Sequence, residues 1–170
     1  LDTEPFYSSY LASYVERDVA ELINWSNLDT FQRFLRIVAT CAGQTANYSK
    51  MANATGVNIK TIQAWLGILE QSYIIFRLPA FFRNFGKRLI KSPKIYFYDT
   101  GLLCYLLEIF DTEEYLLNQN RGAIFENFVI ADAHKSFLHQ GHTPNFYYYR
   151  DNDQRDVDLL YELSDEARLY

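Results

Sequence analysis

The sequence predicts an α+β protein, with a winged helix-turn-helix in the middle of the chain followed by a truncated α/β element. Three observations predict this fold class. Apolar residues repeat at helical spacing in three successive segments, two strand-like runs follow them, and a long helical pattern precedes further strand-like runs. The chain has 170 residues, of which 49% are hydrophobic and 17% aromatic, so it can form a packed core.

The first two elements are predicted to be helices. Residues 5–24 form the first, with apolar side chains at roughly helical spacing, and 25–29 form a polar break. The second covers 31–42, where Asp29 or Thr30 can cap its start and Gly43 can end it. Its apolar positions keep the 3.6-residue period over three turns: Phe31, Phe34, Leu35, Val38, Ala39 and Ala42.

A helix-turn-helix is predicted next. A short helix over 49–55 ends at Gly56, which permits a left-handed turn, and Asn58 can cap a longer helix over 59–69. Residues 73–76 and 94–98 are rich in β-branched and aromatic residues and are predicted strands. Three helices followed by a two-stranded ribbon are typical of a winged helix.

The loop between these strands and the polar face of the longer helix are candidate contacts to double-stranded DNA. The loop is basic and contains no acid, so it could meet a phosphate backbone, while polar side chains near the start of the helix could reach base edges. These candidates are Arg83, Lys87, Arg88, Lys91 and Lys94 in the loop, and Lys60, Thr61 and Gln63 on the helix. The alternative is a solvated helix face and a basic loop that binds an acidic protein surface.

Charge is distributed unevenly along the chain, whose overall net charge is −5. Residues 1–30 carry one basic and six acidic groups, 31–107 carry ten and two, and 108–170 carry five and thirteen. A basic middle between acidic flanks suggests a polyanion partner for one segment. Attraction between the packed segments of the chain itself is the alternative explanation.

The chain from residue 99 onward is predicted to contain three helices followed by strands. Asp99 or Thr100 caps an apolar helix, 111–117 form a short one, and a long helix covers 121–139 and ends before Gly141. Strands follow over 145–149 and from 156, and 167–170 begin another. One side of the long helix is expected to pack inward through Ile124, Phe125, Phe128, Val129, Ala133 and Phe137.

Glu126 and Asp158 are candidate remnants of a nuclease site. Restriction-endonuclease-like folds hold Mg²⁺ with a helix Glu, a strand Asp and a Glu-x-Lys on the following strand. Glu126 and Asp158 would take the first two places, and the third would fall just beyond Tyr170. Alternatively, Glu126 hydrogen-bonds to nearby backbone or pairs with Arg121 or Arg150, and Asp158 pairs with Arg155 or caps a turn.

The chain resembles the C-terminal region of bacterial and archaeal AAA-type P-loop ATPases, a domain of unknown function. The resemblance is carried by "YVERDV" (14–19), the segment 31–84 from "FQRFLRIVAT" to "AFFRN", "KRLIKSPKIYFYDTGLLCYLL" (87–107), "GAIFENFV" (122–129) and "YYYRDNDQRDVDLLYE" (147–162). It implies an ATPase domain ahead of residue 1 that would bind ATP and Mg²⁺, a winged helix in the middle and an endonuclease-like element at the end. The expected organisation is a helical linker over 1–30, a winged-helix domain over 31–107 and an incomplete endonuclease-like region over 108–170.

Several activities are not expected of the chain. It contains no G-x-x-x-x-G-K-[ST] phosphate loop and no Glu-x-Lys, so neither an ATP site nor a complete nuclease site is predicted. His134 and His139 are five residues apart, off the spacing of a helical zinc site, and no metal site or cofactor is expected. Cys41 and Cys104 are expected to be reduced core residues of a cytoplasmic protein, and no segment has membrane-spanning length.

The function predicted from the sequence is that of an accessory, DNA-binding part of an AAA-type ATPase, not itself an enzyme. The alternative is a protein-interaction module that docks a partner protein or the ATPase domain without nucleic acid. A metal-dependent nuclease in the intact protein is a third hypothesis.

Overall fold

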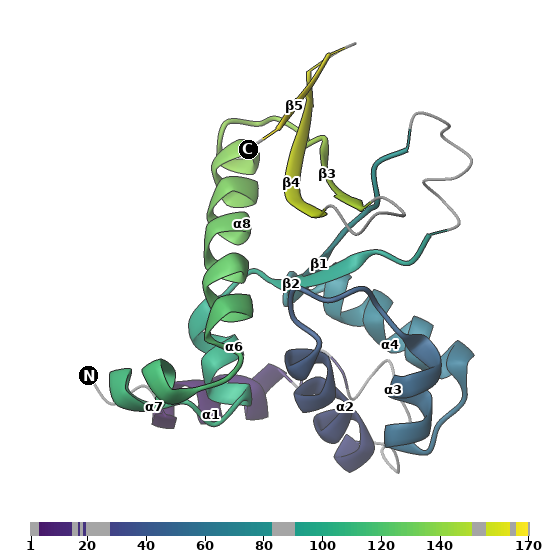
Figure 1. The fold of residues 1–170 in the computed structure, drawn as a ribbon. Coiled ribbons are helices and arrows are strands. Elements are labelled where there is room, and N and C mark those ends of the chain that lie inside the picture. The colour runs from purple at the N-terminus through teal and green to yellow at the C-terminus, as the bar shows by residue number, and fades with distance from the viewer. Residues whose placement is uncertain are drawn as a thin grey trace.

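The computed structural model describes residues 4–14, 17, 19, 28–82, 91–150, 156–163 and 166–169. Within this part of the chain the fold is mixed α+β, with seven helices and two small antiparallel sheets (Figure 1). The elements, in chain order, are α1 (Glu4–Tyr14), α2 (Leu28–Thr40), α3 (Tyr48–Thr55), α4 (Ile59–Gln71), β1 (Ile75–Leu78), β2 (Lys94–Phe97), α6 (Thr100–Leu106), α7 (Thr112–Leu117), α8 (Arg121–His139), β3 (Phe146–Arg150), β4 (Asp156–Leu163) and β5 (Glu166–Leu169).

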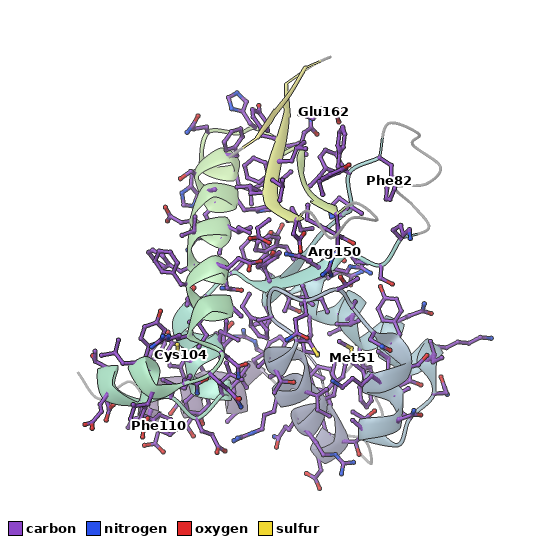
Figure 2. All side chains as sticks on the ribbon, in the orientation of Figure 1. Met51, Phe82, Cys104, Phe110, Arg150 and Glu162 are labelled. Atoms are coloured by element: carbon purple, nitrogen blue, oxygen red, sulfur yellow. The ribbon has the colours of Figure 1, made fainter. Side chains whose placement is uncertain are left out.

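Helices α2, α3 and α4 pack against one another in the first of two apolar cores, to which α6 also contributes Leu102, Leu103 and Leu106. The ring of buried Trp65 on α4 lies 5.3 Å from the rings of both Phe31 and Phe34 on α2, measured between centroids. Met51 on α3 is buried in the same core, and its label in Figure 2 lies among these helices. Aromatic side chains of this size bury large apolar areas, so they dominate the stability of this part of the fold.

The turn between α3 and α4 was predicted from its residues, and the prediction is confirmed. Gly56 follows α3 with a φ of 75°, and its N–H donates to the carbonyl of Ala52. Asn58 caps α4 by accepting from the N–H of Thr61. By contrast, α2 begins at Leu28, so the predicted caps Asp29 and Thr30 lie inside its first turn and that prediction is wrong.

Strands β1 and β2 pair antiparallel, with Ile75 opposite Phe97. The first strand begins two residues later than predicted, because Tyr73 has a φ of 56° and lies in the turn after α4. A residue with a left-handed backbone conformation cannot continue a β-strand. Tyr73 therefore lies in the turn, although aromatic residues favour strands.

The remaining elements stand beside this ribbon. Figure 1 shows α8 upright next to the three-stranded sheet, with α7 and α1 near its lower end. The sheet has the order β3-β4-β5, and an isolated parallel bridge between Ala80 and Tyr148 continues it toward β1. A second apolar core between α8, the ribbon and the sheet includes Phe76, Ile130, Phe146 and Tyr148.

The bounds of α8 match the prediction, as does the left-handed Gly141 after it, with a φ of 76°. The predicted inward face is wrong in half of its members. Phe125, Phe128 and Val129 are exposed, whereas the buried residues of α8 are Ile124, Asn127, Ile130 and Ala131. The helix packs on β2 and α6 and on the second core, and this packing selects a face rotated from the most apolar one.

The remaining sequence predictions are partly confirmed. The helix predicted over 5–24 is present as α1, and most of 15–24 lies outside the described residues. Asp99 caps α6 and Asp111 caps α7. Cys41 and Cys104 are free thiols, but they are half-buried rather than core residues. None of the described helices has the length and apolar character needed to cross a membrane.

Candidate functional site

Lys94, Glu126 and Asp158 form an ionic cluster at the junction of three elements. Lys94 Nζ on β2 lies 2.6 Å from Asp158 Oδ1 on β4 and 3.3 Å from Glu126 Oε1 on α8. The Lys94 side chain is 7% exposed, that of Glu126 24% and that of Asp158 53%. A single ammonium group therefore pairs with two carboxylates, and the Asp158 side chain is about half exposed to solvent.

Tyr96 completes the cluster from the same strand as Lys94. Its hydroxyl donates to Glu126 Oε1 at 2.6 Å, and its side chain is fully buried. The alternation of a strand places positions 94 and 96 on one face, so both side chains reach α8. Gly43 lies beside the Glu126 carboxylate, which is 3.4 Å from where a Cβ would stand, and its φ of 71° favours glycine.

Neither Lys94 nor Tyr96 is deprotonated in this cluster, so neither side chain can act as a nucleophile or a base. Burial lowers the pKa of Lys94, but its hydrogen bond to Asp158 and the charges of Glu126 and Asp158 outweigh that effect and raise it overall. Burial, followed by the hydrogen bond to Glu126, raises the pKa of Tyr96 far above its ordinary value. Lys94 therefore stays charged and Tyr96 stays neutral at physiological pH.

The structure brings Glu126 and Asp158 together, as two members of an endonuclease-like site would be. Their common partner, however, is Lys94, and not Arg121 or Arg150 as the sequence suggested for Glu126. The Arg121 guanidinium donates to the carbonyl of Leu116, and Arg150 Nε lies 3.7 Å from Asp156. Arg155 lies outside the described residues.

The position of Lys94 contradicts its predicted role as a DNA contact. It was expected among the loop residues that contact DNA phosphates, but it is the first residue of β2 and its ammonium is buried between carboxylates. A cation already neutralised inside the fold releases no counterions from DNA. Lys94 therefore belongs to the internal contacts of the protein.

Some of the other predicted DNA contacts are at exposed positions, and the rest lie outside the described residues. Lys60 and Gln63 on α4 are exposed, while the Thr61 hydroxyl is 3.1 Å from the capping oxygen of Asn58. Lys91 is exposed at the end of the loop. Arg83, Lys87 and Arg88 lie outside the described residues, so their role stays a prediction.

A cleft beside the described end of the loop carries positive charge. It has a volume of about 310 Å³ and is lined by Thr45, Ala80, Phe82, Lys91, Ser92, Tyr148 and Arg150. Phe82 and Arg150 are labelled in Figure 2. This lining includes two cations, Lys91 and Arg150, and no acid, although Arg150 also lies 3.7 Å from Asp156 outside the lining. Such a lining suits an anionic group. Arg150 was missed from sequence because it lies 59 positions after Lys91, in a segment dominated by acids.

Asn127 is a second residue that sequence analysis missed. It is fully buried on α8, accepts from the N–H of Phe97 at 2.7 Å and donates to the carbonyl of Phe97 at 3.0 Å. A polar residue within an apolar helical stripe was the available signal, because a buried amide needs such partners. Asn127 and the ionic cluster together attach α8 to β2.

The described residues hold no group of three or more His, Cys, Asp or Glu side chains placed to share a metal ion. His134 instead packs in an aromatic pocket, 4.3 Å from the ring of Phe76 and 5.5 Å from that of Tyr98, between centroids. Burial lowers the pKa of His134, so it is neutral at physiological pH.

Comparison with known proteins places this fold in a family. The model of the family described as Domain of unknown function (DUF8612) matches residues 1–113, and the chain belongs to this family. A second model, Domain of unknown function (DUF4143), matches residues 121–170. Lys94 and Phe97 lie in the first match, and Glu126, Asn127 and Asp158 lie in the second, so the contacts described above join the two matched regions.

The chain is also similar to two curated proteins. It is 32% identical over 164 residues to the uncharacterized protein Rv2008c of Mycobacterium tuberculosis and, equally, to the uncharacterized protein Mb2031c of Mycobacterium bovis. Each alignment covers 96% of this chain and 36% of the relative. The chain thus spans about a third of the length of the curated relatives it matches. No solved structure matches it.

Proposed function

We propose that the chain is a DNA-binding accessory region, without catalytic activity of its own, of a larger cytoplasmic ATPase of the AAA type. Its resemblance to the C-terminal region of such ATPases supports this, and the DUF4143 family that it matches is typically found with them. ATP and Mg²⁺ would be bound by the ATPase domain, because these 170 residues contain no phosphate-binding loop motif.

In this proposal α2, α3, α4, β1 and β2 act as a winged helix-turn-helix, with α4 as the recognition helix. The proposal rests on one observation: helix α4 has a buried apolar side and an exposed polar side. Its buried side chains, Ile62, Trp65, Leu66 and Leu69, fix it in the core, while Lys60 and Gln63 are exposed in its first two turns. Recognition helices contact base edges mainly through residues near their N-terminus.

Phosphate contacts would come from the basic loop and from the cleft that follows it. Lys91 and Arg150 carry positive charge at the cleft, and the hydroxyl-bearing residues Thr45 and Ser92 also line it. We expect Arg83, Lys87 and Arg88 to extend this basic surface. Lys94 is no longer among the proposed contacts, because its charge is neutralised inside the protein.

Fluorescence anisotropy of a labelled duplex, titrated at several salt concentrations, tests the proposal. We expect binding with a steep salt dependence, and a slope that falls by about one unit for each phosphate contact removed. Lys87→Ala combined with Arg88→Ala, and Lys91→Ala combined with Arg150→Ala, should each flatten the slope. Lys60→Ala should weaken binding, and Lys135→Ala on α8 is the matched control that should change neither quantity.

No binding at low salt would overturn the proposal. The same conclusion would follow if the control substitution flattened the slope as much as the loop substitutions. Either result would favour the second candidate function over DNA binding.

That second candidate is a protein-interaction module, and one observation favours it. The start of β2 and the described end of the basic loop pack on the acidic part of the chain. Lys94 of β2 bonds to Glu126 and Asp158, and the Tyr148 hydroxyl donates to the carbonyl of Ser92 in the loop. The basic middle therefore meets some of its complementary charge within the protein. Under this candidate, the endonuclease-like region serves to dock a partner.

A nuclease role is the weakest of the three. Lys94 bonds to both Glu126 and Asp158, so a metal ion at these two carboxylates would meet its positive charge. We propose that the endonuclease-like region has a structural role here.

A further inference from the structure

Helix α8 presents an unusual concentration of apolar side chains to solvent. Phe125 is 61% exposed, Phe128 55% and Val129 45%, and their spacing of three and four residues places them on one face of the helix. We call these three residues the α8 face. Scattered apolar residues are normal on a protein surface, whereas a contiguous set on a rigid helix marks an interaction site.

A groove runs beside the α8 face and adds depth to it. It has a volume of about 480 Å³, between α8 and β4, and is lined by Gly122, Phe125, Glu126, Val129, Ile130, Asp158 and Leu159. Gly122 has open space where a side chain would begin, so the start of the groove stays unobstructed. Phe125 and Val129 belong to both the α8 face and the groove, and the two features form one surface.

The charge of this groove indicates what kind of partner fits it. Its charged lining consists of Glu126 and Asp158, which share the single ammonium of Lys94, and the Asp158 side chain is 53% exposed. With the Lys94 ammonium counted against the two carboxylates, the cluster keeps a net charge of −1, which favours a cation attached to an apolar group over nucleic acid or an anionic lipid surface.

We propose that the α8 face and its groove bind an amphipathic helical segment of a partner protein, with apolar residues on one side and lysine or arginine beside them. The apolar residues would cover Phe125, Phe128 and Val129, as helices do when they occupy hydrophobic grooves. A basic side chain would reach the carboxylate of Asp158, whose side chain is about half exposed. This goes beyond DNA binding and is independent of it, because it uses a surface of opposite charge.

The test uses two labelled peptides as probes and the full 170-residue chain. Both peptides are amphipathic helices of 18 residues with leucine on one face; one carries lysine on the other face and its match carries glutamate. We expect anisotropy to show at least about tenfold tighter binding of the lysine peptide, with this preference falling as salt rises. Asp158→Asn should reduce the preference, whereas Glu113→Gln on α7 should leave it unchanged.

Substitutions on the α8 face locate the binding. Phe125→Ser combined with Val129→Ser should weaken the lysine peptide by about tenfold or more, since apolar anchors dominate such interfaces. The matched control is Leu116→Ser combined with Leu117→Ser, because these residues of α7 are 55% and 80% exposed. The control should bind like the parent chain, and thermal melts should show that both variants remain folded.

Three outcomes would overturn the proposal. The glutamate peptide could bind as tightly as the lysine peptide, or the α7 control could lose as much affinity as the α8 variant. The third is self-association: sedimentation velocity would show a dimer of the parent chain that Phe125→Ser with Val129→Ser converts to monomer, which would make a second copy the occupant. None of these results bears on duplex binding, so each proposal can fail separately.

Discussion

The amide of Asn127 on α8 makes the two hydrogen bonds with the Phe97 backbone that a neighbouring strand would make. It accepts from the Phe97 N–H at 2.7 Å, donates to the Phe97 carbonyl at 3.0 Å and also reaches the Thr100 hydroxyl at 3.2 Å. The bonds to Phe97 are buried, where an unpaired backbone group is costly. Asn127 thus holds the end of β2 and the start of α6 against α8.

Replacing Asn127 by alanine should strongly destabilise the protein. The change leaves the N–H and the carbonyl of Phe97 buried without partners, and we expect a loss of about 3 kcal/mol in the free energy of unfolding. Urea denaturation followed by circular dichroism measures it. Asn120→Ala is the control, because Asn120 begins the same helix without a side-chain capping bond. Equal losses for the two variants would contradict this role.

Removing the charge of Lys94 should cost about 2 to 3 kcal/mol, because Glu126 and Asp158 would then face each other without a counter-ion. Lys94→Met tests this, because it keeps an unbranched side chain that is only one atom shorter and carries no charge. The triple variant Lys94→Met, Glu126→Gln, Asp158→Asn should recover most of the loss, since it removes all three charges. If the triple variant is no more stable than the single variant, the loss of stability does not come from the unpaired charges.

The stability of the protein should fall on mild acidification because of His134. Its folded-state pKa lies below the unfolded value of about 6.5, so the unfolded chain binds more protons as pH falls below 6.5 and unfolding is favoured. The slope attributable to one group is at most about 1.4 kcal/mol per pH unit. His134→Phe should flatten the dependence below pH 6.5, measured by urea denaturation.

Gly101 should be required for α1 to dock on α6. The Tyr7 hydroxyl donates to Asp99 Oδ1 at 3.0 Å, and a Cβ added at Gly101 would lie 2.1 Å from that hydroxyl. Gly101→Ala should therefore displace Tyr7 and cost about 1 kcal/mol, the usual value of one hydrogen bond. Tyr7→Phe should cost a similar amount, and the double variant should cost less than the two added together. Full additivity would show that the two residues do not compete for the same space.

Local chemistry made much of this fold predictable. The turn between α3 and α4 follows from Gly56 and Asn58, and the capping residue of α6 from Asp99, because these residues satisfy backbone groups within three or four positions of themselves. The end of α8 was predictable for the same reason, because the left-handed Gly141 donates its N–H to the carbonyl of Leu138. Such interactions are encoded close together in the sequence and do not depend on the rest of the fold.

The face of α8 and the partner of Glu126 could not be predicted in this way. The apolar pattern gave Phe125 and Phe128 inward positions, but Asn127 and Ile130 are the residues that meet β2 and the second core. Lys94 appeared to belong to a basic surface loop, and only the pairing of β2 with β1 and the position of α8 bring it to Glu126. Both outcomes depend on contacts between segments about 30 residues apart or more.

The bonds from Lys94 and Phe97 to the second matched region also restrict how these proteins can evolve. A recombination event between residues 113 and 121 would join a β2 from one lineage to an α8 from another. The hybrid would keep its stability only if positions 94, 97, 126, 127 and 158 arrived as a compatible set. Related sequences should therefore show correlated replacement at 94, 126 and 158, and the two family regions should be inherited together.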